Sequence, residues 1–347
     1  MNTLFILVLG LSLLAFQGWM FKLLTGERWQ FLATIPLKKN PQGEWLGLNL
    51  TYYGVFTATS LAIGVILFIL MMASVGNSLT LSAVVIAALL AVCLPSARLV
   101  ARIVEGKSHT FTIGGATFVG IICAPLFIEG SNLLMAKYGE LSLIPTMAAM
   151  SIAYSFGEGI GRLACVSFGC CYGKPMQEMP NWVQKVFGPL SFTFSGETRK
   201  ACYASELHGI QILPIQAITS VLYVLCGLIG LFTFLEGFYF FALMFTLAFT
   251  QFWRLYSETL RADYRGGQKI SPYQIMTVVA VVYTAIFMSF YPAPEVVEAN
   301  LINGLSFLWS PEVILGVQAI WLLSFFYTGT STVTSSNLKF QLHRDRI

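Results

Sequence analysis

The sequence predicts an all-α fold, a polytopic membrane protein with about nine transmembrane helices. Of its 347 residues, 56% are hydrophobic and only 10% are charged, and the mean hydropathy is +0.73. Soluble domains carry about 25% charged residues, so this chain has little soluble mass. Apolar runs of about 18–25 residues, which is the length that crosses the hydrocarbon of a bilayer, recur along the whole sequence.

Nine apolar runs predict the transmembrane helices. They cover residues 3–23, 50–73, 80–101, 113–135, 142–165, 212–234, 237–260, 272–291 and 307–328. The first run lacks a basic start and a small-residue cleavage site. We therefore expect it to be a membrane helix and not a cleavable signal peptide.

Two loops are long enough to form structure of their own. Residues 24–48 are amphipathic and basic, and we expect them to lie on the membrane surface. Residues 172–210 form the longest polar segment, which predicts a small extramembrane cap. The net charge of +4 is mild and gives no indication of a nucleic-acid partner.

Glu158 and Arg162 lie in an otherwise apolar helix, where ionisable groups are costly and usually functional. Their i,i+4 spacing places them on one helix face, where they can neutralise each other. One interpretation is a structural ion pair between helices. The other is that Arg162 receives a phosphate, which a guanidinium grips with two parallel hydrogen bonds.

A second charged cluster lies in "FWRLYSETLRADYRGG". Arg254, Glu258 and Arg261 share one face of the expected helix, which would gather two cations around one carboxylate. Such an arrangement suits an anionic lipid headgroup. The alternative is a helix end whose long side chains reach the headgroup level without a specific ligand.

The cysteines near the first cluster are spaced C-x4-C-C, as Cys165, Cys170 and Cys171. A four-cysteine zinc site usually has two well-spaced pairs, and adjacent cysteines fit that pattern poorly. We therefore expect no metal and no cofactor. Plain packing is the simplest interpretation, and a disulfide with Cys202 is the alternative if the loop lies outside the cell.

In this order, the motifs resemble those of the prolipoprotein diacylglyceryl transferase family. The matching positions are Tyr52-Tyr53-Gly54, an arginine at Arg98 or Arg102, Gly114-Gly115, Gly161-Arg162 with Gly169, Leu213-Pro214-Ile215-Gln216, and Arg254 with Glu258 and Arg261. The resemblance implies a transferase core of about seven helices over residues 50–292, with the cap at 172–210. Residues 1–49 would add a helix and the interfacial segment, and residues 293–347 would add a helix and a basic tail.

The resemblance also implies a reaction. A diacylglyceryl group would move from phosphatidylglycerol, or a similar anionic phospholipid, to a cysteine thiol of a lipoprotein precursor in the bacterial cytoplasmic membrane. Glycerol phosphate would leave. The implied catalytic residues are Arg162, Arg254, Glu258 and Glu158. The implied substrate-binding residues are Tyr53, Arg98, Arg102, Gly114, Gly115, Gly161, Gln216 and Arg261.

The chain departs from the family pattern at several positions. The histidine before Gly-Gly is Ile113 here, with His109 one turn away, and Cys165 and Cys170 replace an asparagine and an acidic residue. The Gln216 motif lacks its histidine, tyrosine and glutamate. Two alternatives therefore stay open: a related transferase with another acceptor, and a phospholipid-binding protein without catalysis. The side of the membrane is also open. The basic loops all fall on one side, which charge alone would make cytoplasmic, whereas the resemblance implies that the signature loop lies outside the cytoplasmic membrane.

Overall fold

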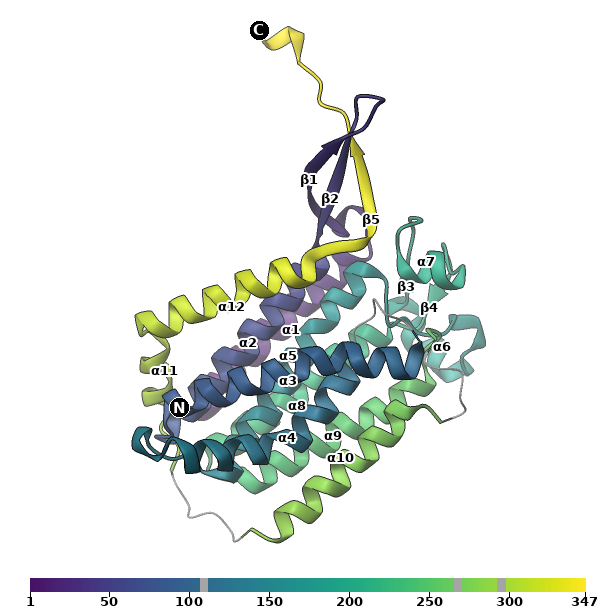
Figure 1. The fold of residues 1–347 in the computed structure, drawn as a ribbon. Coiled ribbons are helices and arrows are strands. Elements are labelled where there is room, and N and C mark those ends of the chain that lie inside the picture. The colour runs from purple at the N-terminus through teal and green to yellow at the C-terminus, as the bar shows by residue number, and fades with distance from the viewer. Residues whose placement is uncertain (107–111, 265–269, 292–297) are drawn as a thin grey trace.

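The computed structural model describes residues 1–106, 112–264, 270–291 and 298–347. Within them, nine helices have 18 residues or more, which confirms the predicted all-α fold (Figure 1). They are α1 (Asn2–Leu24), α2 (Tyr52–Ser74), α3 (Leu79–Glu105), α4 (Ile113–Leu134), α5 (Leu143–Phe168), α8 (Ile215–Leu235), α9 (Tyr239–Thr259), α10 (Pro272–Ser289) and α12 (Pro311–Gly329). Three helices are shorter: α6 (Asn181–Phe187), α7 (Lys200–Ser205) and α11 (Leu301–Leu308).

Seven of the nine long helices in the described segments are long and apolar enough by themselves to cross a membrane. The other two are α5 and α9, which carry the charged motifs. Both pack inside the bundle, where α5 contacts α2, α8 and α9. Their polar faces are therefore turned toward protein and not toward lipid, as is usual for ionisable groups at membrane depth.

Small residues bring the central helices close together. A β carbon at Gly159 of α5 would lie 3.1 Å from the backbone oxygen of Ser220 in α8. The hydroxyl of Ser220 donates a hydrogen bond of 2.5 Å to the carbonyl of Gly159. Close backbone approach with an interhelical hydrogen bond is the usual means of helix association in membranes. It fixes the position of α5, the helix of Glu158 and Arg162.

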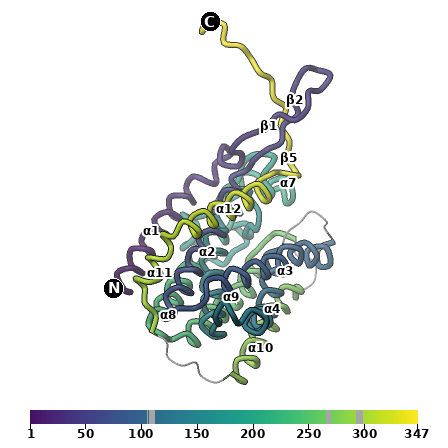
Figure 2. Tube along the Cα trace, turned by 60° about the vertical axis from the view of Figure 1, so that its left-hand side comes forward, coloured from purple at the N-terminus to yellow at the C-terminus, as the bar shows by residue number. Residues whose placement is uncertain are grey.

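The segment expected on the membrane surface forms a β-hairpin. β1 (Phe31–Lys39) and β2 (Trp45–Thr51) pair in antiparallel fashion, and β5 (Thr330–Leu338), from the expected basic tail, pairs with the other edge of β2. The three-stranded sheet projects beyond the helices (Figures 1 and 2). Its third strand, β5, follows β2 by almost 300 positions in the sequence, so the local sequence pattern does not reveal it.

The cap is a compact unit at the same end of the bundle as the sheet (Figure 1). It contains α6, α7 and the short antiparallel pair β3 (Phe192–Thr193) and β4 (Gln211–Ile212). Its Arg199 is fully buried and donates hydrogen bonds to the carbonyls of Leu24, Gly26, Val166 and Ser167. Burial lowers the pKa of Arg199 to about 10, so the guanidinium stays charged at neutral pH and fastens the cap to the ends of α1 and α5.

Candidate active site

One face of α5 carries the first half of the site. Tyr154, Glu158 and Arg162 follow each other at intervals of four residues, so they line one stripe of the helix. Arg162 Nη2 donates to Glu158 Oε1, and the exposed fractions of the two side chains are only 12% and 3%. The ion pair is thus inside the protein. Arg162 Nε is buried and has no hydrogen-bond partner among the described residues.

Arg254 extends this stripe from the neighbouring helix α9. Its Nη1 donates a hydrogen bond of 3.2 Å to the hydroxyl of Tyr154. The guanidinium passes over Gly114 at the start of α4, where a β carbon would lie 2.6 Å from Nη2. Gly114 therefore allows this close approach of the Arg254 guanidinium. Gly115 does the same toward Val100 of α3. Sequence reasoning missed Tyr154, although its spacing from Glu158 was a usable signal.

A small polar cavity joins three of the predicted site residues. Arg162, Gln216 and Arg261 line it, together with Cys171, Ile215, Thr219 and Ser257. The volume within which the centre of a water molecule can lie is about 10 Å³. This cavity therefore has room for about one water. Gln216 Oε1 is buried there without a hydrogen-bond partner among the described residues. The cavity therefore combines two guanidinium groups with unsatisfied polar atoms.

Arg261 differs from its expected position. Helix α9 ends at Thr259, so Arg261 lies beyond the helix and does not share its face. Its Nε and Nη2 each donate a hydrogen bond of 2.7 Å to the carboxylate of Asp263. Burial alone would lower the pKa of Arg261, but the Asp263 charge outweighs it and raises the pKa. Arg261 therefore stays charged and is held in one orientation.

The expected gathering of two cations around Glu258 is wrong for the described part of the chain. Its two ion pairs are Arg162 with Glu158 and Arg261 with Asp263. Glu258 Oε1 is buried and accepts no hydrogen bond from any described group. Glu158 and Asp263, not Glu258, are thus the carboxylates that hold the two guanidinium groups beside the cavity.

Backbone pairing holds the three motifs together at the end of the bundle. The Lys174 amide donates to the Leu260 carbonyl over 3.1 Å, and the Leu213 amide donates to the Lys174 carbonyl over 2.9 Å. Gly173 is needed there, because its β carbon would lie 2.9 Å from that of Leu213. Gln216 Nε2 also donates a hydrogen bond of 3.0 Å to the carbonyl of Cys170. The cysteine loop is thus fixed between the start of α8 and the end of α9.

Three other predicted residues, Tyr53, Gly161 and Arg98, are not part of the cavity lining. Tyr53 packs edge-on against Phe168, with ring centroids 5.8 Å apart, and its phenol is close to the three cysteines and Glu158. Gly161 faces Ser60 of α2. Arg98 lies over the ring of Tyr327 at 5.0 Å.

The remaining arginine, Arg102, is exposed on α3. Neither Arg98 nor Arg102 lines the cavity, and His109 lies outside the described residues. The structure therefore leaves the expected α3 arginine without a contact to the cavity.

The cysteines converge more closely than their spacing suggested. The Sγ atoms of Cys165, Cys170 and Cys171 all lie within 4.8 Å of one another. None of the seven cysteines forms a disulfide in the described structure, and Cys202 is not part of this cluster. The disulfide with Cys202 is therefore not formed.

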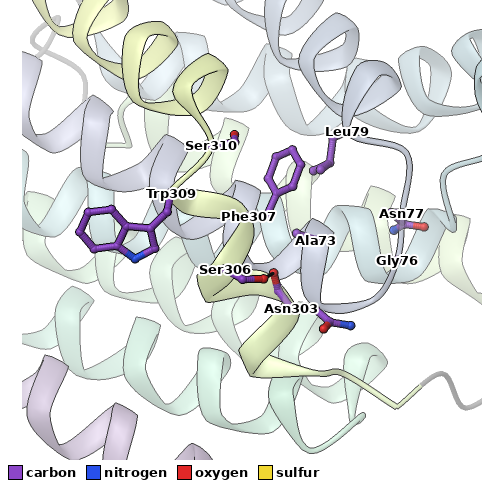
Figure 3. Close-up of a pocket in the computed structure, with 9 residues that line it drawn as sticks. All are labelled: Ala73, Gly76, Asn77, Leu79, Asn303, Ser306, Phe307, Trp309 and Ser310. Carbon is purple, nitrogen blue, oxygen red and sulfur yellow. Dashed lines mark hydrogen bonds between the residues drawn. The ribbon is translucent and has the colours of Figure 1, made fainter.

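A larger cavity lies at the opposite end of the bundle, between the α2–α3 turn and the α11–α12 turn (Figure 3). Its volume is about 490 Å³. The residues around it are Ala73, Gly76, Asn77, Leu79, Asn303, Ser306, Phe307, Trp309 and Ser310, none of which is ionisable. It can neither neutralise a phosphate nor move a proton, so the small polar cavity is the better candidate.

A protein-family model decides the family. The model of prolipoprotein diacylglyceryl transferase matches residues 44–290, the stretch that holds every candidate site residue. The chain belongs to the prolipoprotein diacylglyceryl transferase family. Membership implies a transferase that moves a diacylglyceryl group to a prolipoprotein in a membrane. A search of curated proteins and a search of solved structures find no match.

The stretch that matches the family model begins at the second strand of the sheet and ends just after α10. Helices α1 and α12 lie outside it, yet both pack on matched helices, α1 on α8 and α12 on α2. A β carbon at Gly54 would lie 3.0 Å from the carbonyl oxygen of Phe325 in α12. The glycine of the Tyr-Tyr-Gly motif therefore serves the contact with an added helix here.

Proposed function

We propose that the donor is phosphatidylglycerol or a similar anionic phospholipid, and that the acceptor is a cysteine thiol of a lipoprotein precursor. Glycerol phosphate is the leaving group. The observation that carries this proposal is the polar cavity, where Arg162 and Arg261 flank buried polar atoms at the end of the bundle. Two fixed guanidinium groups suit a phosphate, because each guanidinium can donate two parallel hydrogen bonds to a pair of phosphate oxygens.

The arginines would act on the departing phosphate. When the bond between the glycerol carbon and the phosphate oxygen breaks, negative charge grows on the phosphate, and preorganised cations stabilise that charge most strongly. Arg162 has a buried Nε without a partner among the described groups, so it has a donor available. Arg254, held by Tyr154, supplies a further cation along the α5 stripe, and Tyr53 and Gln216 would add hydrogen bonds to the headgroup.

The two glutamates take different roles in this proposal. Glu158 holds the Arg162 guanidinium and so sets the direction of its remaining donors. Glu258 has a buried oxygen that accepts no hydrogen bond from the described residues, and it is the proposed acceptor of the thiol proton. The backbone around Gly114, Gly115 and Gly161 keeps the helices close enough for the arginines to reach one ligand.

The test uses the purified full chain with vesicles of labelled phosphatidylglycerol and a precursor peptide containing one cysteine. We expect mass spectrometry to find a diacylglyceryl thioether on the peptide and an equal amount of glycerol phosphate. Arg162→Ala should abolish both products, whereas Arg344→Ala, an exposed arginine of the tail, should not. Glycerol phosphate without a modified peptide would indicate another acceptor. Intact phosphatidylglycerol would indicate lipid binding without catalysis.

We place the protein in the bacterial cytoplasmic membrane with the cap on its outer side. A precursor that has crossed the membrane would meet the site there, and the arginines on that side would be explained by the anionic headgroup they bind. Labelling of a single cysteine introduced at the exposed Lys185 with an impermeant reagent in intact cells tests the orientation. Labelling only after lysis would place the site on the cytoplasmic side.

A further inference from the structure

Three thiols lie at one point beside the cavity and have no role in the mechanism above. The Sγ atoms of Cys165, Cys170 and Cys171 lie within 4.8 Å of one another. Three thiolates on one tetrahedral zinc ion, with zinc–sulfur bonds of about 2.3 Å, are separated by about 3.8 Å. A disulfide needs about 2.05 Å. The observed spread is thus close to that of a shared metal ion, and shifts of about 1 Å would complete the geometry.

The local backbone produces this convergence. Cys165 lies in the last turn of α5, and Gly169, which caps the end of this helix, has a φ of +71°. Cys171 also has a positive φ, +56°, which a residue with a side chain adopts rarely. This second reversal turns the side chains of two adjacent cysteines toward Cys165. Two hydrogen bonds hold the loop there. The Cys170 amide donates a hydrogen bond of 3.0 Å to the Cys165 carbonyl, and Gln216 Nε2 donates one to the Cys170 carbonyl.

The charges around the cluster suit a thiolate–metal centre. Three thiolates and a divalent ion carry a net charge of −1. Arg162 acts electrostatically on Cys165 and Cys171, Arg261 on Cys171, and Lys200 on Cys170 and Cys171. Cations and hydrogen-bond donors around the ligands are the usual support of a bound metal. Cys165 and Cys170 are buried, whereas Cys171 is half-buried and lines the cavity.

The cavity also lacks a base of its own. Its lining in the described structure includes no carboxylate and no imidazole. Carboxylic acids and thiols ordinarily differ by about four pKa units, so a carboxylate alone leaves an acceptor thiol protonated by a factor of about 10⁴. Coordination to zinc removes this barrier, because a thiol on the metal is deprotonated outright.

We propose that Cys165, Cys170 and Cys171 bind a zinc ion whose fourth position faces the cavity and takes the acceptor thiol as a thiolate. The second half rests on the proposed function, whereas zinc binding itself does not. The acceptor S–H bond breaks as sulfur binds the metal, and the proton goes to Glu258. The metal-bound sulfur then forms a bond to the glycerol carbon. The carbon–oxygen bond to phosphate breaks, its electron pair stays on the phosphate oxygen, and the thioether leaves the metal.

Zinc binding is tested on the purified full chain, loaded with Zn²⁺ under reducing conditions and then dialysed. We expect about one zinc per chain by elemental mass spectrometry, and an at least tenfold lower content in Cys165→Ser, Cys170→Ser and Cys171→Ser. Cys202→Ser and Cys226→Ser, outside the cluster, should keep the metal. Thermal unfolding shows which variants remain folded. A wild-type chain without zinc, or cluster variants that retain it, would overturn the proposal, as would a disulfide within the cluster.

Co²⁺ tests the fourth position. The wild-type chain loaded with Co²⁺ should show thiolate-to-cobalt charge-transfer absorption, and a cysteine peptide should change the cobalt bands, whereas its serine analogue should not. No change with the cysteine peptide would contradict the role of the fourth position. If zinc is bound but no peptide is modified, the proposed function fails while the site stands. If chelated, zinc-free protein modifies the peptide at the wild-type rate, the catalytic role of zinc fails and the proposed function stands.

Discussion

The guanidinium of Arg254 lies directly over the α carbon of Gly114, where a β carbon would be 2.6 Å from Nη2. Two motifs that lie 140 positions apart thus share one contact, and the absence of a side chain on α4 sets the position of a cation on α9. The opposing hydroxyl of Tyr154 fixes the other side of the same group.

Gly114→Ala should therefore displace Arg254 and lower diacylglyceryl transfer about 10- to 100-fold, because misplacement of a catalytic group by about 1 Å has effects of that size. Gly130→Ala in the same helix is the matched control, since its β carbon meets nothing within 4 Å. Transfer rates with labelled phosphatidylglycerol compare the two. Equal rates for both variants would show that the Arg254 position is unimportant.

Arg261→Lys should lower transfer at least tenfold. Lysine keeps the charge but lacks the planar fork that makes two hydrogen bonds to Asp263, so the cation loses its fixed direction. Asp263→Asn should have a smaller effect in the same direction, because one amide oxygen can still accept. Arg28→Lys, an exposed arginine outside the cavity, serves as control. A variant at Arg261 with wild-type kcat and KM would remove this residue from the site.

Gln216→Leu should loosen the cysteine loop, because the Cys170 carbonyl then loses the side-chain donor it has in the described structure. We expect faster protease cleavage within residues 170–175 and about tenfold slower transfer. Gln184→Leu removes a similar side-chain bond, to the Met179 carbonyl over 2.7 Å, but inside the cap. It should leave the loop protected. Cleavage products identified by mass spectrometry distinguish the two, and identical patterns would refute the anchoring role.

Arg199→Ala should destabilise the fold by at least about 3 kcal/mol, since several buried carbonyls lose charged hydrogen bonds at once. Its effect is expected on the thermal unfolding midpoint in detergent. Lys185→Ala, an exposed cap lysine, should leave the midpoint unchanged. An unaltered midpoint in the Arg199 variant would mean that the cap does not depend on this residue.

The sequence predicted the long helices from their apolar runs, and for seven of the nine long helices in the described chain length and apolar composition alone are enough to indicate a membrane span. Three of the seven residues that line the cavity, Arg162, Gln216 and Arg261, were among the predicted site residues, since they come from separate motifs in a recognisable order. Sequence reasoning placed Arg261 wrongly, because helical spacing was assumed past Thr259, where the helix ends. The turn beyond that point gives Arg261 a partner two residues away, which a helical face does not offer.

Two other features depend on information that the local sequence lacks. The convergence of Cys165, Cys170 and Cys171 requires positive φ values at Gly169 and Cys171, and a non-glycine residue gives little sign of such a conformation. β5, the second partner strand of β2, follows all nine long helices of the described chain. No spacing rule therefore connects β2 with β5.

The pairing of Trp45 with Leu338 also constrains biosynthesis. As a ribosome makes the chain, the β1–β2 hairpin emerges well before β5, the strand that covers its second edge, because β5 follows all nine long helices of the described chain. Until then β2 keeps a row of unpaired backbone groups, which are open to pairing with other chains. Closure of this sheet is therefore a late event that follows insertion of the helices between the two strands, and it reports on whether the whole bundle has assembled.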